Sequence, residues 1–363
     1  MTQSLRQDAI LRAVRRNGSV RVNDIAAELG VSTMTVRRDI TALADRGAIA
    51  RVHGGATLPR ARPATALSPV SAPLSTQSYQ SHTKRQQLSV GMLVPAASHY
   101  YRQVIQGAQA AAEPLGIRLT LGVSCYDPAE DRAQVERLLE SRPDGLLLTP
   151  SRPALSPEPS ALTWISELPV PTVIVERHYT PGTGPYLLDS VSSDHELGAV
   201  RALDHLAGLG HRHIALLTCP TPTSPWIRSG FDRAVGMLGL VADTPRVADH
   251  LYDSAEELDA FLDAVTASGT TAVLAHPDEQ AARLLQQALT RGMAVPDDLA
   301  IVAYDDELAA LADIPLTAVA PARRAVGRAA VAALAQRLRE GRDHVPQRTL
   351  LVPRLNIRSS TAP

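Results

Sequence analysis

The sequence predicts an α/β protein in which a small basic N-terminal domain precedes two doubly wound parallel sheets. The chain has 363 residues, which is more than one ordinary domain holds. From Leu88 onward, short apolar runs alternate with amphipathic stretches, as in βαβ units. Charge is segregated, because residues 1–87 carry 13 Arg or Lys against 5 Asp or Glu and the rest carry 23 against 32. We therefore expect a polyanionic partner for the N-terminal part only.

The first domain is expected over residues 1–58, with three short helices and a hairpin. The helices should lie over residues 3–16, after Asn23, and after Ser32 or Thr33, each followed by a residue that tolerates the left-handed conformation. Residues 49–52 then alternate and a Gly-Gly pair follows, which predicts the hairpin. The buried stripe of the third helix, at i, i+4 and i+7, is Val36, Ile40 and Leu43.

Residues 59–87 are expected to form a linker, because prolines interrupt a run of Ala, Ser and Thr and no apolar period survives. Residues 88–363 then form the two-lobed part. Its expected strands are Ser89–Val94, Arg118–Val123, Gly145–Leu148, Thr172–Val175, His213–Leu217, Thr271–Ala275 and Leu299–Ala303. Its expected helices are Val104–Leu115, Ala129–Leu139, Glu196–Leu209, Asp278–Arg291 and Arg324–Arg339. A ligand of such a fold binds in a cleft at the carboxyl ends of the strands.

Several function classes are disfavoured. Cys125 and Cys219 are far apart and fit no metal spacing, so we expect buried thiols in a reducing cytoplasm, with neither metal nor cofactor. The first residues lack the apolar core of a signal peptide, and no apolar run is long enough to cross a membrane. There is no nucleophile elbow, no HExxH and no Walker loop, so we expect no enzyme. A transport-type binding protein would need the missing signal peptide.

The N-terminal residues VSTMTVRRDI at 31–40 and RVHGGA at 51–56 resemble a DeoR-type winged helix-turn-helix. The resemblance implies that the third helix reads the major groove of double-stranded DNA and that the hairpin contacts the backbone. The residues that it makes candidates for base or phosphate contact are Thr33, Thr35, Arg37, Arg38, Arg51 and His53. Each of them could instead belong to a solvated helix face.

The rest of the chain resembles the LacI/GalR-type sugar sensors, which share the type I periplasmic-binding-protein-like fold. The matching stretches include DGLLLTPS at 144–151, DHELG at 194–198 and VPDDLAIVAYDD at 295–306. The resemblance implies a first lobe over about 88–211 and 306–345 and a second lobe over about 212–305 and 346–363. It also implies a homodimer, possibly arranged as a tetramer.

Carried over by position, the resemblance gives a candidate sugar site. The aromatic pair Tyr100 and Tyr101 would supply a ring face. Arg228, with Trp226 in the same cleft loop, would clamp a hydroxyl or carboxylate. The remaining candidates are Arg177, Asp194, Asp278 and Asp305, although Asp194 could simply cap a helix.

Two departures from the family affect these expectations. Pro277 stands where the family has an asparagine before Asp278, so His276 becomes the candidate for the missing polar contact. The proline-rich linker replaces the hinge helix of lac-type repressors. We expect a cytoplasmic, sugar-controlled DNA-binding repressor, with a sugar-phosphate-responsive regulator or an activator as the alternatives.

Overall fold

The computed structural model describes residues 19–21, 25–26, 31, 35–36, 39–40, 43, 50–52, 55–57, 87–97, 100–151, 159–177, 179, 184–247 and 254–362. Residues 1–81 and 82–363 form two compact units, and each is described by itself.

The N-terminal unit contains a small antiparallel sheet in the order β1-β3-β2. The strands are β1 (Ser19–Arg21), β2 (Ala50–Val52) and β3 (Gly55–Thr57), so β2 and β3 form the predicted hairpin, whereas β1 was not predicted. Val36, Ile40 and Leu43 are helical and at most 3% exposed, which confirms the predicted stripe.

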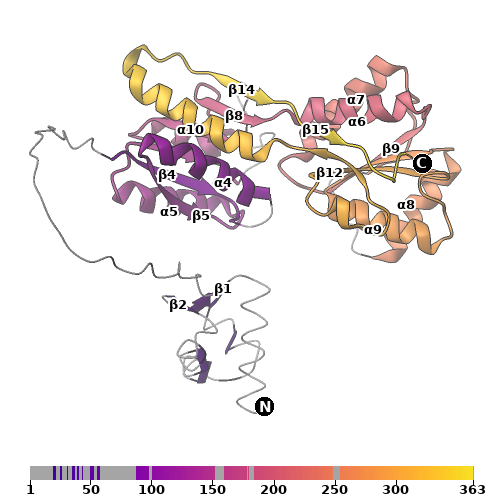
Figure 1. Cartoon of the computed structure of the whole chain (residues 1–363), viewed down its shortest axis with the longest axis horizontal. Helices are drawn as coiled ribbons and strands as arrows, with labels where there is room; N and C mark the ends of the chain where they lie inside the picture. Colours follow the sequence, from indigo (N-terminus) through magenta and orange to yellow (C-terminus); the bar gives the residue numbers. More distant parts are fainter. Residues whose placement is uncertain are drawn as a thin grey trace, which may run out of the picture. The chain divides into compact units, whose positions relative to one another are not determined.

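The larger unit has two lobes, each built on a six-stranded sheet (Figure 1). The first sheet has the order β14-β8-β7-β6-β4-β5 and is parallel throughout. Its strands are β4 (Ser89–Val94), β5 (Arg118–Val123), β6 (Gly145–Leu148), β7 (Thr172–Val175), β8 (Asp189–Ser193) and β14 (Arg348–Leu351). Its helices are α4 (Tyr100–Ala112), α5 (Pro128–Glu140) and α10 (Arg323–Glu340), with short 3-10 turns at Glu113–Leu115, Pro159–Glu167 and Gly341–Asp343.

The second sheet has the order β10-β9-β11-β12-β13-β15, and its edge strand β15 runs antiparallel to its neighbour while the others are parallel. Its strands are β9 (Ile214–Thr218), β10 (Arg246–Val247), β11 (Ala272–His276), β12 (Ala300–Tyr304), β13 (Thr317–Ala320) and β15 (Arg354–Asn356). Its helices are α6 (His195–Gly208), α7 (Ser224–Leu238), α8 (Ala255–Ala267) and α9 (Asp278–Thr290), with a 3-10 turn at Ala309–Leu311.

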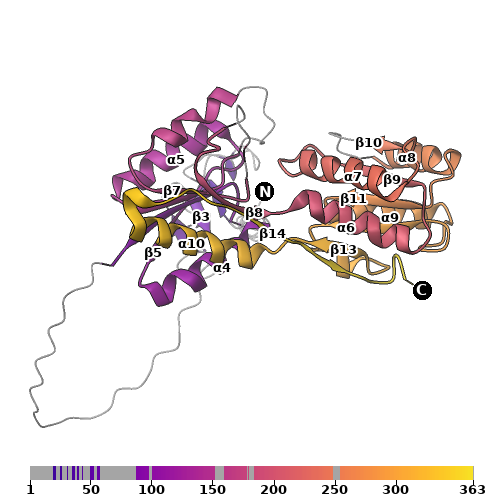
Figure 2. The same cartoon turned by 90° about the horizontal axis from the view of Figure 1, so that it is seen from above.

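Helices cover both faces of each sheet, as the alternating pattern predicts (Figure 2). In the first lobe α4 and α10 pack on one face of the sheet, and α5 packs on the other. In the second lobe α6 and α7 share one apolar cluster, while α8 and α9 share another. The central strands are buried on both faces, which is why each reads as a continuous apolar run.

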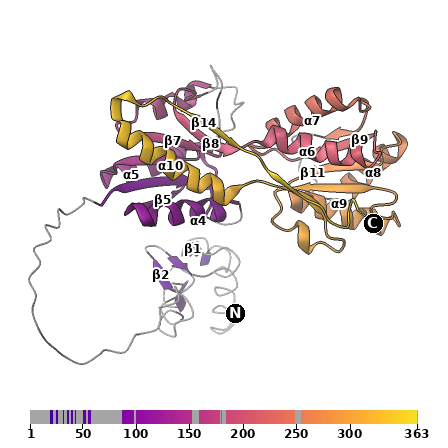
Figure 3. The same cartoon turned by 45° about the horizontal axis from the view of Figure 1, so that its top comes forward.

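The chain passes between the lobes three times (Figure 3). The passages lie between β8 and α6, between β13 and α10, and between β14 and β15. The predicted lobe boundaries are therefore wrong in three places. Residues 195–211 and 306–320 belong to the second lobe, and residues 346–351 belong to the first. The reason is that β8, with the sequence DSVSS, and β14, with the sequence RTLL, do not form apolar runs, so no such pattern marked where the chain changes sheets.

All seven predicted runs are strands, four of them with the predicted bounds, and all five predicted helices are present. Helices α7 and α8 and strands β8, β10, β13, β14 and β15 were not predicted. Among the described residues, no helix combines the length and the apolar character that crossing a membrane requires.

Candidate functional site

A cavity of about 450 Å³ lies between the two lobes, at the carboxyl ends of their strands. Parallel strands end at one edge of a sheet, so the loops that follow them meet there. The first lobe contributes Tyr100, Tyr101, Tyr126, Glu176 and Arg177; the second contributes Pro220, Thr221, Pro222, Thr223, His276, Pro277, Asp278, Glu279, Asp305 and Glu307; and His195 lies at the first passage.

The wall on the first lobe is organised by Glu176 and Arg177, which follow β7. The Tyr100 hydroxyl donates to Glu176 Oε1 at 2.8 Å, and the Ser193 amide donates to Oε2 at 3.1 Å. Burial raises the pKa of Glu176 above its ordinary value, and the bonds from Ser193 and Tyr100 offset only part of this effect. Glu176 adopts a left-handed φ of 52°, a conformation that non-glycine residues adopt mostly at turns and functional sites.

The Arg177 guanidinium is fixed in place, but one of its three nitrogens has no partner among the described residues. Its Nε donates to the Pro150 carbonyl at 3.1 Å, and Nη1 donates to the Tyr101 hydroxyl at 3.1 Å and to the Glu176 carbonyl at 2.7 Å. The residue is only 5% exposed, and its Nη2 has no hydrogen-bond partner among the described residues. A buried donor without a partner is costly, so an acceptor that reached Nη2 would stabilise it.

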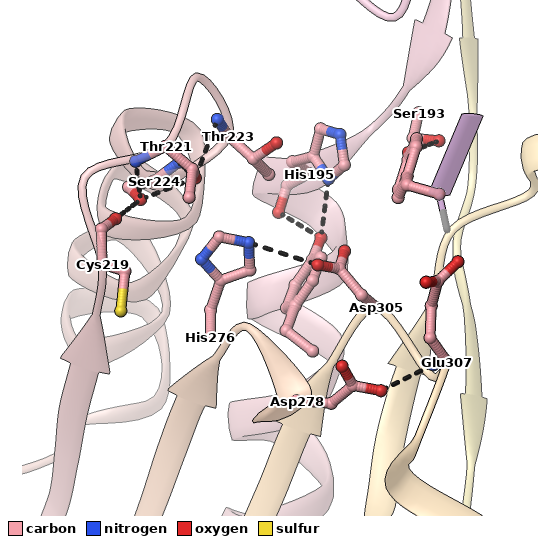
Figure 4. Close-up of polar contacts among 12 residues, drawn as sticks. Ser193, His195, Cys219, Thr221, Thr223, Ser224, His276, Asp278, Asp305 and Glu307 are labelled. Atoms are coloured by element: carbon pink, nitrogen blue, oxygen red, sulfur yellow. Dashed lines mark hydrogen bonds and ion pairs between the residues drawn. The ribbon is translucent and has the colours of Figure 1, made fainter. Parts of the chain in front are cut away.

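The wall on the second lobe centres on His276 and Asp305, which lie at the ends of neighbouring strands (Figure 4). His276 Nε2 lies 3.5 Å from Asp305 Oδ2, and His276 Nδ1 is buried without a partner among the described residues. Burial raises the pKa of Asp305, but the nearby imidazoles of His276 and His195, together with Arg323, lower it more, so its pKa lies below the ordinary value. Asp305 is therefore an ionised acceptor at neutral pH, with a left-handed φ of 99°.

His195 connects the two walls at the passage between β8 and α6. Its Nε2 lies 3.8 Å from Glu176 Oε2 in the first lobe, and its Nδ1 lies 3.2 Å from the Tyr304 hydroxyl in the second. The polar groups of both lobes are thus linked through His195, a residue at the first passage between the lobes.

A tight turn before α7 brings Thr221 and Thr223 to the cavity. The Ser224 hydroxyl donates to the Cys219 carbonyl, and Thr221 Oγ1 accepts from the Thr223 amide at 3.3 Å (Figure 4). Because its polar groups bond one another, this turn holds its shape before any ligand binds.

Asp278 lines the cavity but also has a local structural role. Its Oδ2 accepts from the amides of Glu307 and Leu308, both at 2.6 Å, and from that of Ala309 at 3.2 Å. Burial raises its pKa, and these amide bonds lower it less. Asp278 therefore fixes the loop after β12, which carries Asp305.

Five of the eight predicted ligand residues line this cavity: Tyr100, Tyr101, Arg177, Asp278 and Asp305. Asp194, Trp226 and Arg228 are not among the lining residues. Asp194 caps α6, with Oδ1 accepting from the Leu197 amide at 2.9 Å. Trp226 and Arg228 lie in helix α7 rather than in a loop, and Trp226 packs against the apolar cluster of the first lobe.

The sequence prediction missed Glu176, His195, Tyr126, Glu307 and the two threonines, although His276 was proposed as a substitute. Their common feature is a polar or aromatic residue shortly after a strand end. That feature could have identified Glu176, Tyr126, Glu307 and the threonines, which follow predicted strands, but not His195, because β8 was not predicted.

In the N-terminal unit, Thr33, Arg37, Arg38 and His53 lie outside the described residues. Thr35 is helical and half-buried, and Arg51 lies in β2. Their contacts with DNA stay predictions.

Comparison with known proteins gives matches at both ends of the chain. A DeoR-like helix-turn-helix domain matches residues 6–62, and a periplasmic binding protein-like domain matches residues 203–361. An uncharacterized HTH-type transcriptional regulator in the aml 5' region of Streptomyces limosus is 31% identical over 361 residues and covers 94% of both chains.

Two further matches are more distant. The arabinose metabolism transcriptional repressor of Geobacillus stearothermophilus is 25% identical over 353 residues, covering 93% of this chain and 90% of the relative. The transcriptional regulator CelR, solved in complex with cellobiose, has a TM-score of 0.63 and 26% identity, and the match covers 75% of this chain and 84% of that one. The chain therefore belongs to the helix-turn-helix transcriptional regulators, with a DeoR-like DNA-binding domain joined to a periplasmic-binding-protein-like domain.

Proposed function

We propose that a neutral carbohydrate binds in the cavity between the lobes and controls how tightly the helix-turn-helix domain binds its operator. The observation that carries this proposal is the pair of buried nitrogens without partners among the described residues, Arg177 Nη2 on one lobe and His276 Nδ1 on the other. A polyol can accept from Arg177 and donate to the ionised Asp305 across the cavity. Such a ligand would hold the two lobes together.

The charges around the cavity favour a neutral sugar over a sugar phosphate. Among the described residues, the lining includes the carboxylates Glu176, Asp278, Glu279, Asp305 and Glu307, but only one guanidinium, that of Arg177. A phosphate dianion would be repelled by most of this set. The relatives support the carbohydrate class, because one is a repressor of arabinose metabolism and one was solved with cellobiose.

We further propose that the regulator works as a homodimer in the cytoplasm, as a repressor without enzymatic activity. Two copies of a helix-turn-helix would read two half-sites, and a sugar that prefers one dimer geometry would shift the affinity for DNA. A coupling of about 1–3 kcal/mol is typical of such regulators.

Operator titration of the full chain tests the proposal. An operator selected from random duplexes would be titrated by fluorescence anisotropy with and without a panel of free sugars and sugar phosphates. We expect one neutral sugar to change the dissociation constant at least about fivefold, in either direction. If no member of the panel changes operator affinity or gives heat in calorimetry, the proposed effector class is wrong.

A further inference from the structure

Tyr126 is the most exposed aromatic residue lining the cavity, and the function proposed above does not use it. It follows β5 and precedes α5, and 52% of its surface is exposed. The other two tyrosines of the wall are more deeply placed, since Tyr101 is 5% exposed and Tyr100 is bound through its hydroxyl to Glu176. Tyr126 therefore stands at the outer end of the cavity.

The loop that carries Tyr126 is held on both sides. Asp127 donates its amide to the Ser124 carbonyl at 3.0 Å, and its side chain caps α5 by accepting from the Ala129 amide at 2.9 Å. Ser124 in turn lies 3.0 Å from the Ser151 hydroxyl, oxygen to oxygen. Tyr126 itself has a left-handed φ of 61°. These bonds fix the backbone, so the position of the exposed ring is set by the fold.

The exposed ring also has a defined orientation. It meets the Tyr101 ring edge to face, with centroids 6.5 Å apart and planes at 61°. This contact orients Tyr126 while about half of the residue stays accessible. An aromatic surface of this kind packs well against the C–H face of a sugar ring.

The two ends of the cavity differ in chemistry. The inner end carries buried polar groups, with Arg177 at 5% and His276 at 2% exposure. The outer end carries Tyr126, and the second lobe adds the apolar rings of Pro220 and Pro222 to the lining. Polar recognition of hydroxyls therefore belongs to the inner end, and apolar stacking belongs to the outer end.

The cavity is larger than one sugar ring needs. Its volume of 450 Å³ equals about 15 water molecules at roughly 30 Å³ each. A hexopyranose has twelve non-hydrogen atoms, which take less room than twelve waters because they are bonded to one another. One ring at the inner end therefore leaves space beside Tyr126.

We infer that the cavity has two subsites and that the effector is a neutral disaccharide, whose outer ring stacks on Tyr126. This inference rests on the carbohydrate function proposed above and adds the size of the ligand. The inner subsite, formed by Arg177, His276 and Asp305, holds the first ring.

Calorimetry on the full chain tests the inference with disaccharides and their component sugars: maltose, cellobiose, trehalose and lactose against glucose and galactose. The variants are Tyr126→Ala, Tyr126→Phe, which keeps the ring, and Tyr186→Ala, a control at another exposed tyrosine of the first lobe outside the cavity lining. We expect a disaccharide to bind most tightly. Tyr126→Ala should weaken its binding about tenfold, because the outer sugar ring loses the aromatic face on which it packs.

The other variants should change little. Tyr126→Phe and Tyr186→Ala should stay within twofold of the wild type, and Tyr126→Ala should not alter the affinity for a component monosaccharide. The inference is overturned if a monosaccharide binds as tightly as any disaccharide, or if Tyr126→Ala leaves disaccharide binding unchanged. Either result leaves the carbohydrate function standing, whereas the absence of binding by any sugar of either size defeats both.

Discussion

At the scale of single residues, the cavity is defined by side chains that the protein has fixed but not fully satisfied. Among the described residues, Arg177 makes three hydrogen bonds but leaves Nη2 without a partner, and His276 leaves Nδ1 without one. Asp305 stays ionised because His276 stabilises its charge. A neutral polyol suits this set because each hydroxyl can both donate and accept.

For sugar affinity, the negative charge of Asp305 should matter more than the size of its side chain. In Asp305→Asn the side chain keeps its shape but loses its charge, so hydroxyls of the sugar lose an ionised acceptor. Hydrogen bonds to charged groups contribute about 1.5–3 kcal/mol, so we expect sugar affinity to fall at least about tenfold in calorimetry. Asp313→Asn, at an exposed carboxylate of the same lobe, is the control and should bind normally. Equal affinities for both variants and the wild type would show that Asp305 does not contact the ligand.

In the DNA-binding domain, Arg38→Ala should weaken operator binding without affecting sugar binding. If Arg38 contacts a phosphate, the loss should be similar for all sequences, and the salt dependence of log K should decrease by about one. If Arg38 reads a base, the loss should depend on the base at one position. Anisotropy titrations over a series of salt concentrations measure both, with Arg342→Ala in the sensor as the control. An unchanged affinity would remove Arg38 from the DNA contact surface.

At the level of helices and strands, the contact between α6 and α7 sets the geometry next to the passage from β8 to α6. Helices α6 and α7 pack so closely that a Cβ at Gly230 would lie 2.2 Å from the backbone oxygen of Glu196. A Cβ at Gly236, six residues further along α7, would meet no atom of the described residues within 4 Å. The two glycines therefore differ in whether they tolerate a side chain, although they lie in the same helix.

This difference predicts opposite effects of the same substitution. Gly230→Ala must push α6 and α7 apart, and we expect it to lower the free energy of unfolding by about 2 kcal/mol or more. Gly236→Ala should raise it by up to about 1 kcal/mol, because alanine favours the helix. Urea unfolding followed by circular dichroism measures both. Equal effects at the two positions would mean that the α6–α7 contact adjusts freely.

The end of α10 carries a pH-dependent contact with β8. His344 Nε2 lies 2.9 Å from Asp189 Oδ1, and its Nδ1 lies 2.7 Å from Glu340 Oε2. Only a protonated imidazole donates to both carboxylates, and the bond to Asp189 raises the pKa of His344. Burial raises the pKa of Asp189, but its bonds with Gln347, His344 and Arg337 lower it more.

Because the pKa of His344 is raised, its contribution to the free energy of unfolding must decrease as the pH rises. Its contribution to stability is complete below the ordinary histidine value near 6.5 and is lost as the pH rises through the higher folded value. His344→Gln should therefore destabilise the protein more at pH 6 than at pH 9, as measured by urea unfolding. His205 is the opposite case, because burial lowers its pKa, so His205→Gln should cost more at the higher pH. The same sign for both variants would contradict the assignment.

At the scale of the whole sensor, the two lobes are joined by three passages and by the polar groups around His195. A ligand that contacts both walls of the cavity should therefore reduce the motion of both walls. Hydrogen exchange with and without the best sugar should show slower exchange in the segments around Arg177 and around His276 together, and no change in α8. Protection confined to one lobe would show that the ligand does not bridge the cavity.

Much of this arrangement could be predicted from the chain itself. Buried parallel strands must be apolar on both faces, so β4, β6, β7, β9, β11 and β12 are recognisable as apolar runs. The strands at the passages, such as β8 with its sequence DSVSS, carry serine and aspartate, which no apolar pattern marks. Helix α7 contains two glycines, which have low helix propensity, so its composition disfavoured the prediction of a helix.

The fold class and the basic DNA-binding domain could be predicted from the sequence alone, whereas the candidate cavity residues came from its resemblance to the sugar sensors. These features are local, because each depends on the period of apolar residues or on a short motif. The folded structure was needed to show that Arg177 lines the cavity while Arg228 and Trp226 do not, and that Asp278 holds a loop. These outcomes depend on which strand ends meet across the lobes and on how each side chain's hydrogen bonds are satisfied. Neither can be predicted from the spacing of residues along the chain.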